Sequence, residues 1–280
     1  MNLFEEIKMH GTIDFPIELY EVNEEHPSYE MPFHWHPHIE IIRVIKGNLK
    51  ISLNKTDYNM KKGDIIFVNS EIVHGSLPQN CIYECLVYDN NFIPAIAHKG
   101  QIFSEMISKG NIRINEYFPS CNDEIHTCIN LIFDNMKKKE KGYKYSVVGM
   151  ISHLYGIIIK NGVYSKITDT EKQTSISVTK LKNVLEFIRN NYSNKITLKD
   201  MADIAKVSPK YLCSMFKERT HKSPVDYLIY FRVEKAVHFL ITTDKSVTEI
   251  ALECGFDDLS YFIKTFKKLK GVSPGIFRKK

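Results

Sequence analysis

Four side chains that could bind a metal ion or a polar ligand lie close together in the first third of the chain. His34 and His36 are separated by one residue, Glu40 follows four residues later, and His74 stands further along. Imidazole and carboxylate groups are ligands that divalent transition metals accept. Because alternate residues of a strand share one face, His34, His36, His38 and Glu40 are predicted to converge. The sequence therefore predicts a polar site in this region.

Short apolar runs around this cluster predict β-strands. Residues 17–88 contain β-branched runs separated by turn signals at intervals of about 8–12 residues. One of these signals, Lys46-Gly47-Asn48, is predicted to end the strand that carries Glu40. The spacing is typical of a small antiparallel barrel or jelly roll. The predicted strands include residues 39–45, 49–53, 65–68 and 81–87.

The order of these residues resembles the first motif of the cupins, which has two histidines spaced by one, a glutamate and then a glycine, here Gly47. Gly63-Asp64 with His74 resembles a second cupin motif, although Asn69 and Glu71 stand where the family usually has proline and glycine. The resemblance implies an interior pocket for a small effector. The residues predicted to bind that effector are His34, Trp35, His36, Glu40 and His74.

Three interpretations of the cluster remain open. A metal-free pocket would hydrogen-bond a polar metabolite such as a carbohydrate, with Trp35 stacking on the sugar ring. A divalent metal could instead be held by His34, His36, Glu40 and His74. The histidines could also be purely structural. No catalytic residue is predicted, because nothing resembles a nucleophilic triad, a phosphate loop or a catalytic carboxylate pair; an enzyme would have to be a metal-dependent cupin.

A pattern that occurs twice in the last hundred or so residues predicts two helix-turn-helix units. The copies span about 196–217 and 246–268, and the offset between matching residues grows from 49 (Leu198 to Val247) to 50 (Pro224 to Pro274). One residue has therefore been added between the two helices of the second copy. A short helix, a turn and a second helix are the elements that place a recognition helix in the major groove of DNA.

Each copy carries its own start and turn signals. Thr197 with Asp200, and Ser246 with Glu249, fit the capping box. The turns are predicted at 206–207 and 255–256, where one residue has to adopt a left-handed conformation that glycine tolerates best. The predicted caps of the second helices are Ser208, followed by Pro209, and either Asp257 or Asp258.

The basic charge of the chain is confined to the segment that carries the repeat. Residues 176–280 contain 20 Lys and Arg against 11 Asp and Glu, whereas the remaining 175 residues contain 18 against 22. A net charge of +9 in one segment and −4 in the other favours a nucleic acid as the partner of the C-terminal segment. The alternative is an ordinary all-α domain.

Residues 178–278 resemble the signature of the AraC/XylS transcription regulators. The resemblance rests on Arg232-Val-Glu-Lys-Ala236, Gly255-Phe256, Ser260-Tyr261-Phe262 and Gly271-Val-Ser273-Pro274. It implies a seven-helix domain in which a central helix, from 225 to about 241, joins the two units. At 1.5 Å per residue that helix is about 25 Å long. It could hold two recognition helices about 34 Å apart, in successive major grooves.

Helical spacing assigns the two faces of each predicted recognition helix. Leu212, Met215 and Phe216 should be buried in the first helix, and Phe262 and Phe266 in the second. The outward positions match those with which the resembled family reads bases and phosphates, although Ser214 stands where many relatives have arginine. The predicted DNA-contacting residues are Ser208, Pro209, Lys210, Cys213, Ser214, Lys217, Leu259, Ser260, Ile263, Lys264 and Lys267.

Two apolar stripes at helical spacing lie between the halves of the chain. The first comprises Ile125, Cys128, Ile129, Ile132, Phe133 and Met136, and the second Val148, Ile151, Leu154, Tyr155 and Ile158. In the resembled family, helices at this place pack two subunits together, so we expect a homodimer. The rival interpretation is that the helices cover the barrel. A polar linker is predicted at residues 165–177.

Together these patterns predict an α+β protein with a cupin-like domain at 1–120, a dimerisation segment at 121–164 and a DNA-binding domain at 178–280. The expected function is a cytoplasmic transcription regulator that binds double-stranded DNA and a small-molecule effector, without a cofactor or a membrane span. Six cysteines without C-x-x-C pairs fit a reducing compartment. The alternatives are a metal-dependent cupin enzyme fused to a DNA-binding domain, and a constitutive DNA-binding protein.

Overall fold

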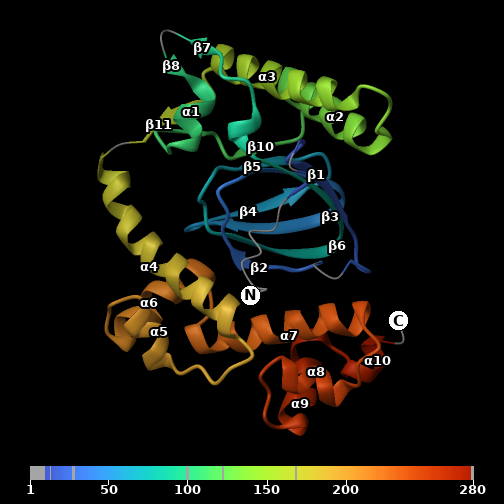
Figure 1. Ribbon diagram of the computed structural model, residues 1–280, viewed down its shortest axis with the longest axis vertical. Helices are drawn as coiled ribbons and strands as arrows, with labels where there is room; N and C mark the ends of the chain where they lie inside the picture. The colour runs from blue at the N-terminus through green and yellow to red at the C-terminus, as the bar shows by residue number, and fades with distance from the viewer. Residues whose placement is uncertain are drawn as a thin grey trace. The chain divides into compact units, whose positions relative to one another are not determined.

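A computed structural model describes residues 10–12, 14–26, 29–98, 101–121, 123–167 and 169–278. Contacts divide the chain into two units, which are described separately here (Figure 1). Unit 1 comprises residues 1–24 and 35–173, and unit 2 comprises residues 25–34 and 174–280. The first residues of the predicted cupin-like domain lie outside the described part of the chain.

Unit 1 is built around an antiparallel sheet whose strands follow the order β1-β6-β3-β5-β10, with β4 beside β3. The predicted β domain is thereby confirmed. Strand β5 is buried along its whole length, as are residues 39–44 of β3 and 83–88 of β6, because both faces of the sheet are covered there. The bounds are β1 (Ile17–Val22), β3 (Ile39–Leu53), β4 (Thr56–Lys61), β5 (Ile65–Val68), β6 (His74–Tyr88) and β10 (Tyr117–Phe118).

The strand β3 runs through the predicted turn at Gly47. Its pairing with β6 shifts register between Val44 and Lys46 and again between Lys46 and Asn48. Gly47 has a φ of +76°, and a Cβ there would collide with the backbone of Asn80. The prediction of two separate strands was therefore wrong, because the glycine forms a bulge that bends one strand without ending it.

The two faces of this sheet have different surroundings. On one face, Ile39 and Ile41 of β3 pack in a single core with Leu86 of β6 and with residues of α2 (Glu124–Lys138) and α3 (Tyr143–Asn161). The opposite face of β3 carries Glu40, because successive side chains of a strand alternate. The helices α2 and α3 thus cover one side of the sheet (Figure 1), and Glu40 belongs to the other face.

The apolar stripe of α2 belongs to this core. Ile129, Ile132 and Phe133 are completely buried within the single chain, and Ile151 and Leu154 of α3 are buried with them. The prediction that this stripe forms the dimer interface was therefore wrong. The helices cover the barrel, as the rival interpretation held, and a subunit contact would have to use their outer faces, where Leu131 is 49% exposed.

Smaller elements complete unit 1. Strand β9 pairs with β11 antiparallel, and β7 pairs with β8. Tyr155 of α3 donates a hydrogen bond to Asn90, which lies in a short 3-10 helix. The bounds of these elements are η1 (Asn90–Phe92), β7 (Ala97–His98), β8 (Gln101–Ile102), α1 (Phe103–Ser108), β9 (Ile112–Ile114) and β11 (Tyr164–Lys166).

The predicted linker at residues 165–177 is mostly regular structure. Residues 165 and 166 belong to β11, and α4 runs over Asp169–Asn191. The boundary between the two units does lie in this predicted linker, but most of the segment is helical, which its polar composition did not indicate. Thr168 lies outside the described residues. The boundary between the two units falls within α4, at 173–174.

Unit 2 contains two helix-turn-helix motifs joined by one long helix. Between the two helices of each motif lie residues 205–208 in the first copy and residues 254–258 in the second, so the added residue lies in the second turn. The helices are α5 (Leu198–Ile204), α6 (Pro209–Thr220), α7 (Pro224–Thr242), α8 (Val247–Glu253), α9 (Leu259–Lys270) and α10 (Pro274–Arg278), and residues 25–34 add β2 (Met31–His34).

The local signals of the repeat are confirmed. Thr197 and Ser246 form complete capping boxes, and Asp258 caps α9 through the backbone N–H of Tyr261. Lys206 has a φ of +51° in the first turn, where the second copy has a glycine. The matching position in both turns thus has the predicted left-handed conformation, although lysine adopts it at a steric cost.

One arginine of α7 ties the second motif to the end of α4. Arg232 donates from Nε to the carbonyl of Tyr192 at 2.7 Å and from Nη2 to that of Asn194 at 2.8 Å. Gly255 has a φ of +79°, and a Cβ there would come within 2.6 Å of the same Tyr192 carbonyl. Glycine is therefore required at this turn for its conformation and for the space it leaves.

The helices of the described residues are each too short or too polar to cross a membrane.

Candidate functional site

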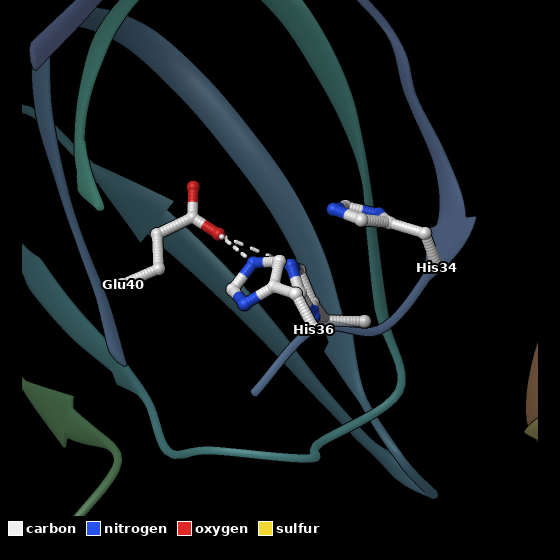
Figure 2. Close-up of side chains that lie close together, drawn as sticks. His34, His36 and Glu40 are labelled. Atoms are coloured by element: carbon white, nitrogen blue, oxygen red, sulfur yellow. Dashed lines mark hydrogen bonds and ion pairs between the residues drawn. The ribbon is translucent and has the colours of Figure 1, made fainter. Parts of the chain in front are cut away.

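A carboxylate held by two imidazoles lies on the face of the sheet opposite the helices. Figure 2 shows that the side chains of Glu40 and His36 point toward one another. Glu40 is 3% exposed, and its Oε2 lies 3.3 Å from Nε2 of His36 and 3.1 Å from Nε2 of His74. His34 is the fourth member of the group, whose potential ligand atoms all lie within 4.8 Å of one another. The structure thus brings together the four polar residues predicted from the sequence.

A bend in the chain produces this convergence. Residues 35–38 are not in a strand, so the predicted alternation over His34, His36, His38 and Glu40 was wrong. The bend directs His36 toward Glu40, whereas Nδ1 of His38 is buried without a hydrogen-bond partner among the described residues. Burial lowers the pKa of His38, which favours its neutral form. His38 is therefore outside the cluster.

The second nitrogen of each imidazole is bound to a backbone carbonyl. Nδ1 of His36 lies 3.1 Å from the oxygen of His38, and Nδ1 of His74 lies 2.9 Å from that of Ile72. A carbonyl only accepts, so Nδ1 carries the proton and a neutral ring presents a lone pair at Nε2. Two lone pairs and a carboxylate oxygen at one point suit a cation, and carbonyl-anchored histidines are typical of metal ligands. Without a metal, protonated imidazoles would donate to Glu40.

Electrostatics keep Glu40 charged. Burial raises the pKa of this carboxyl, but hydrogen bonds from His36 and His74 and their positive charge outweigh burial and hold the pKa well below its usual range. Burial and the charge of Glu40 raise the pKa of the Cys85 thiol well above its ordinary value. The site therefore offers a carboxylate beside a neutral thiol.

Cys85 is a neighbour of this site that the sequence did not indicate. Cys85 pairs with Ile42 of β3 and with Tyr20 of β1, so it shares the face that carries Glu40. The alternation along β6 could have indicated that face, but only once the register between the strands was known. Trp35 is half-buried, and its role in binding an effector stays a prediction.

The first recognition helix presents the predicted faces. Leu212, Met215 and Phe216 of α6 are buried, which confirms the core assignment. Among the predicted DNA contacts, Ser208, Pro209, Lys210, Ser214 and Lys217 are exposed, and Cys213 is half-buried. Ser208 also caps the helix.

The second recognition helix repeats this arrangement. Phe262 and Phe266 of α9 are buried at the centre of a core that includes Val233 and Val237 of α7. The predicted DNA contacts on this helix are all exposed, namely Leu259, Ser260, Ile263, Lys264 and Lys267.

Comparisons with known proteins cover both units. A family described as a helix-turn-helix domain matches residues 201–280, and one described as a cupin domain matches residues 22–76. An uncharacterized HTH-type transcriptional regulator of Bacillus subtilis, YdeC, is 25% identical over 98% of this chain and 95% of its own length. The melibiose operon regulatory protein of Escherichia coli is 22% identical over 94% of this chain and 91% of its own length.

Among solved structures, a transcriptional regulator of Chromobacterium violaceum with an AraC-type DNA-binding domain is 27% identical. The match covers 37% of this chain and 92% of the chain in that structure, with a TM-score of 0.35. The matches to YdeC and to the melibiose operon regulatory protein extend over both domains of this chain and over nearly the full length of those two regulators. This chain is an AraC-type transcription regulator. Its N-terminal cupin domain is the effector-binding part, and its helix-turn-helix units bind DNA.

Two exposed tyrosines of the AraC-type unit were missed by the sequence analysis. Tyr211 is 50% exposed and Tyr261 is 49% exposed, and each is the third residue of its recognition helix. Tyrosine hydroxyls are common partners of DNA phosphates. The repeat itself could have identified this pair, because the two residues are separated by the same offset of 50 as the two prolines after the motifs.

Replacing Lys264 by alanine is expected to weaken specific DNA binding by about 1–3 kcal/mol and to relax sequence preference, because an exposed lysine on a recognition helix can read a base edge. Competition binding with a randomised duplex library measures both effects. Lys268→Ala, one turn further along α9, is the matched control and is expected to weaken all sequences alike. Uniform weakening by Lys264→Ala would mark it as a phosphate contact.

Proposed function

We propose that this AraC-type regulator changes its action on double-stranded DNA when a small polar molecule binds at His36, Glu40 and His74, with His34 and Trp35 completing the site. The single observation that carries the proposal is the buried Glu40 carboxylate, which two imidazoles hold charged within the cupin domain. Burying a charge costs free energy, and side chains with strongly shifted pKa values cluster at functional sites.

A carbohydrate is the effector class that we favour. Sugar hydroxyls both donate and accept hydrogen bonds, so they can pair with a carboxylate, with imidazoles and with the Cys85 thiol. The relative named for the melibiose operon supports this class. The protein would act by binding in the cytoplasm and would itself catalyse no reaction, since an effector shifts a regulator by favouring one of its conformations.

A divalent metal in the same cluster is a second candidate, as the basis for a metal-assisted effector site or a metal-dependent cupin activity. It is favoured by the carbonyl-anchored Nδ1 atoms of His36 and His74, which leave Nε2 for coordination. A bound metal would supply a positive centre that orients hydroxyl or carboxylate oxygens of the effector. Metal analysis of the purified protein before and after chelation, with a turnover assay, separates these candidates.

The variant His36→Ala is expected to lose the effector response while unit 2 still binds DNA. Losing a hydrogen bond to a charged group costs about 1.5–3 kcal/mol, so effector affinity should fall roughly 10- to 150-fold. A panel of mono- and disaccharides is first tested by thermal shift, and the hit is titrated calorimetrically. The matched control is His38→Ala, a histidine outside the cluster. An unchanged affinity in His36→Ala would contradict the assignment.

We further propose that the regulator is a homodimer that uses the exposed faces of α2 and α3. A groove of about 620 Å³ lies between these helices, and Thr127, Leu131 and Met150 are among its lining residues. Leu131 is 49% exposed and lines this groove together with the apolar side chains of Met150 and Ile157. The groove and this leucine together support a second subunit as the covering surface.

Leu131→Glu is expected to yield a folded monomer, because it places a charge in the proposed interface without touching the core. The monomer should bind a paired DNA site about 10²- to 10⁴-fold more weakly, because a second DNA-binding unit is no longer attached to the first. Sedimentation and DNA titration measure the two effects. Tyr145→Glu, at a residue 89% exposed outside the groove lining, is the control. An unaltered dimer in Leu131→Glu would place the interface elsewhere.

A further inference from the structure

A second group of potential metal ligands lies at the start of α2. Cys121, Asp123 and His126 each direct a ligand atom to a common point, and these atoms lie within 4.8 Å of one another. Sγ of Cys121 is 3.0 Å from Oδ2 of Asp123 and 3.4 Å from Nδ1 of His126. The group comprises a thiol, a carboxylate and an imidazole, and it shares no residue with the cluster around Glu40.

His126 is buried in a way that its other contacts do not explain. The residue is 4% exposed, and its Nε2 has no hydrogen-bond partner among the described residues. Its Nδ1 lies 2.9 Å from Oδ1 of Asp123. The polar partners of the ring are therefore Asp123 and Cys121, the other two members of the group. The nitrogen that faces Cys121 and Asp123 is Nδ1, so the position of this atom is what supports a ligand role for the ring.

Asp123 can serve this group without giving up its structural role. Its Oδ1 accepts the backbone N–H of His126 at 2.8 Å and so caps α2, which leaves Oδ2 on the side of the Cys121 thiol. Cys121 is exposed and the side chain of Asp123 is 43% exposed, so an ion can reach them from solvent. The cap holds the carboxylate in place, and the helix holds His126 beside it.

We propose that Cys121, Asp123 and His126 form a site for a thiophilic divalent cation such as Zn²⁺. One thiolate, one imidazole and one carboxylate are a donor set that suits Zn²⁺ and Co²⁺, which both accept tetrahedral coordination. Three protein ligands leave a fourth position for water or for a group from another molecule. Binding releases the Cys121 thiol proton to solvent, and no electron transfer is involved.

Occupancy of this site would act on the outer surface of α2. Asp123 also lines the groove between α2 and α3, together with Glu124 and His153. An ion there would neutralise the negative charge at this end of the groove and fix the first turn of α2. The site therefore couples the availability of a metal to the shape and charge of an exposed surface.

Cobalt titration of the full chain, reduced and stripped with a chelator, tests the proposal. We expect an absorption band from thiolate-to-cobalt charge transfer, which saturates at one equivalent and disappears when Zn²⁺ is added. The band should be absent in Cys121→Ser and retained in Cys213→Ser, which removes another partly accessible thiol. It should also be retained in the double variant His36→Ala with Glu40→Gln, which disables the barrel cluster near Cys85.

Asp123→Asn preserves the helix cap, because asparagine caps as well as aspartate. It should nevertheless weaken cobalt binding by more than the roughly 10–100-fold that loss of an outer-shell partner costs. At a Zn²⁺ concentration about a hundred times the dissociation constant, the unfolding midpoint should rise by roughly 5–10 °C in the wild type only. The absence of a band in the folded wild type, or its persistence in Cys121→Ser, would overturn the site.

Discussion

A fragment of residues 169–280, which keeps α4 whole, is expected to bind duplex DNA with an affinity that falls about 10³- to 10⁵-fold between 50 and 200 mM salt. Such a fall is typical of proteins that contact roughly 6–10 phosphates and release the counterions bound there. The basic charge confined to residues 176–280, and the exposed lysines on α6 and α9, supply the contacts. Fluorescence anisotropy at several salt concentrations measures the slope.

Charge reversal on the full chain tests whether these helices carry the effect. Lys217→Glu and Lys267→Glu, at matching positions of α6 and α9, should each reduce the salt slope by about one. Lys138→Glu on α2 makes the same change of charge on another exposed helix and should leave the slope unaltered. Binding that is insensitive to salt, or equally reduced by Lys138→Glu, would contradict an interface made by the two recognition helices.

The second large effect concerns the core of unit 1. Ile129→Ala is expected to destabilise this unit by about 2–5 kcal/mol, the usual cost of truncating a fully buried isoleucine. Ile129→Glu should cost more and leave the unit unfolded, because an unpaired charge would have to enter the core. Ile129 is completely buried against Ile132, Phe133 and the sheet. Urea denaturation followed by circular dichroism measures the loss.

Tyr145→Glu, on α3 and outside the groove, serves as the control. Tyr145 is 89% exposed, so a charge introduced there should alter the free energy of unfolding by less than about 0.5 kcal/mol. DNA binding by unit 2 should survive in both variants. A folded, monomeric Ile129→Glu protein would mean instead that this stripe faces another subunit.

Unit 2 was predictable because its signals are local. A capping box is formed by two residues three apart, and the paired copies showed the same spacing twice, down to the residue added in the second turn. The buried faces of α6 and α9 follow from helical period alone, as Phe262 and Phe266 confirm. Interactions between near neighbours can be read from sequence without knowing the fold.

The parts that could not be predicted depend on distant contacts. The stripe of α2 indicated burial, but the partner it packs against, the sheet of its own chain, is set by tertiary structure. The bend that brings His36 to Glu40 and the bulge at Gly47 depend likewise on pairing between strands far apart in sequence. Cys121, Asp123 and His126 are a different case, because they lie within six residues of one another but carry no familiar motif that would single them out.

The helix α7 also limits what an effector can change. Its 19 residues form a rod about 28 Å long, with Tyr227 packed on Phe216 of α6 near one end and Leu240 in the core of the second motif near the other. One inserted residue would turn the second motif by about 100° relative to the first. The distance and the rotation between the two motifs are therefore set by the protein's own backbone, and with them the spacing between the two short DNA sequences of a single half-site. An effector can then change only whether that half-site is bound and what is bound together with it.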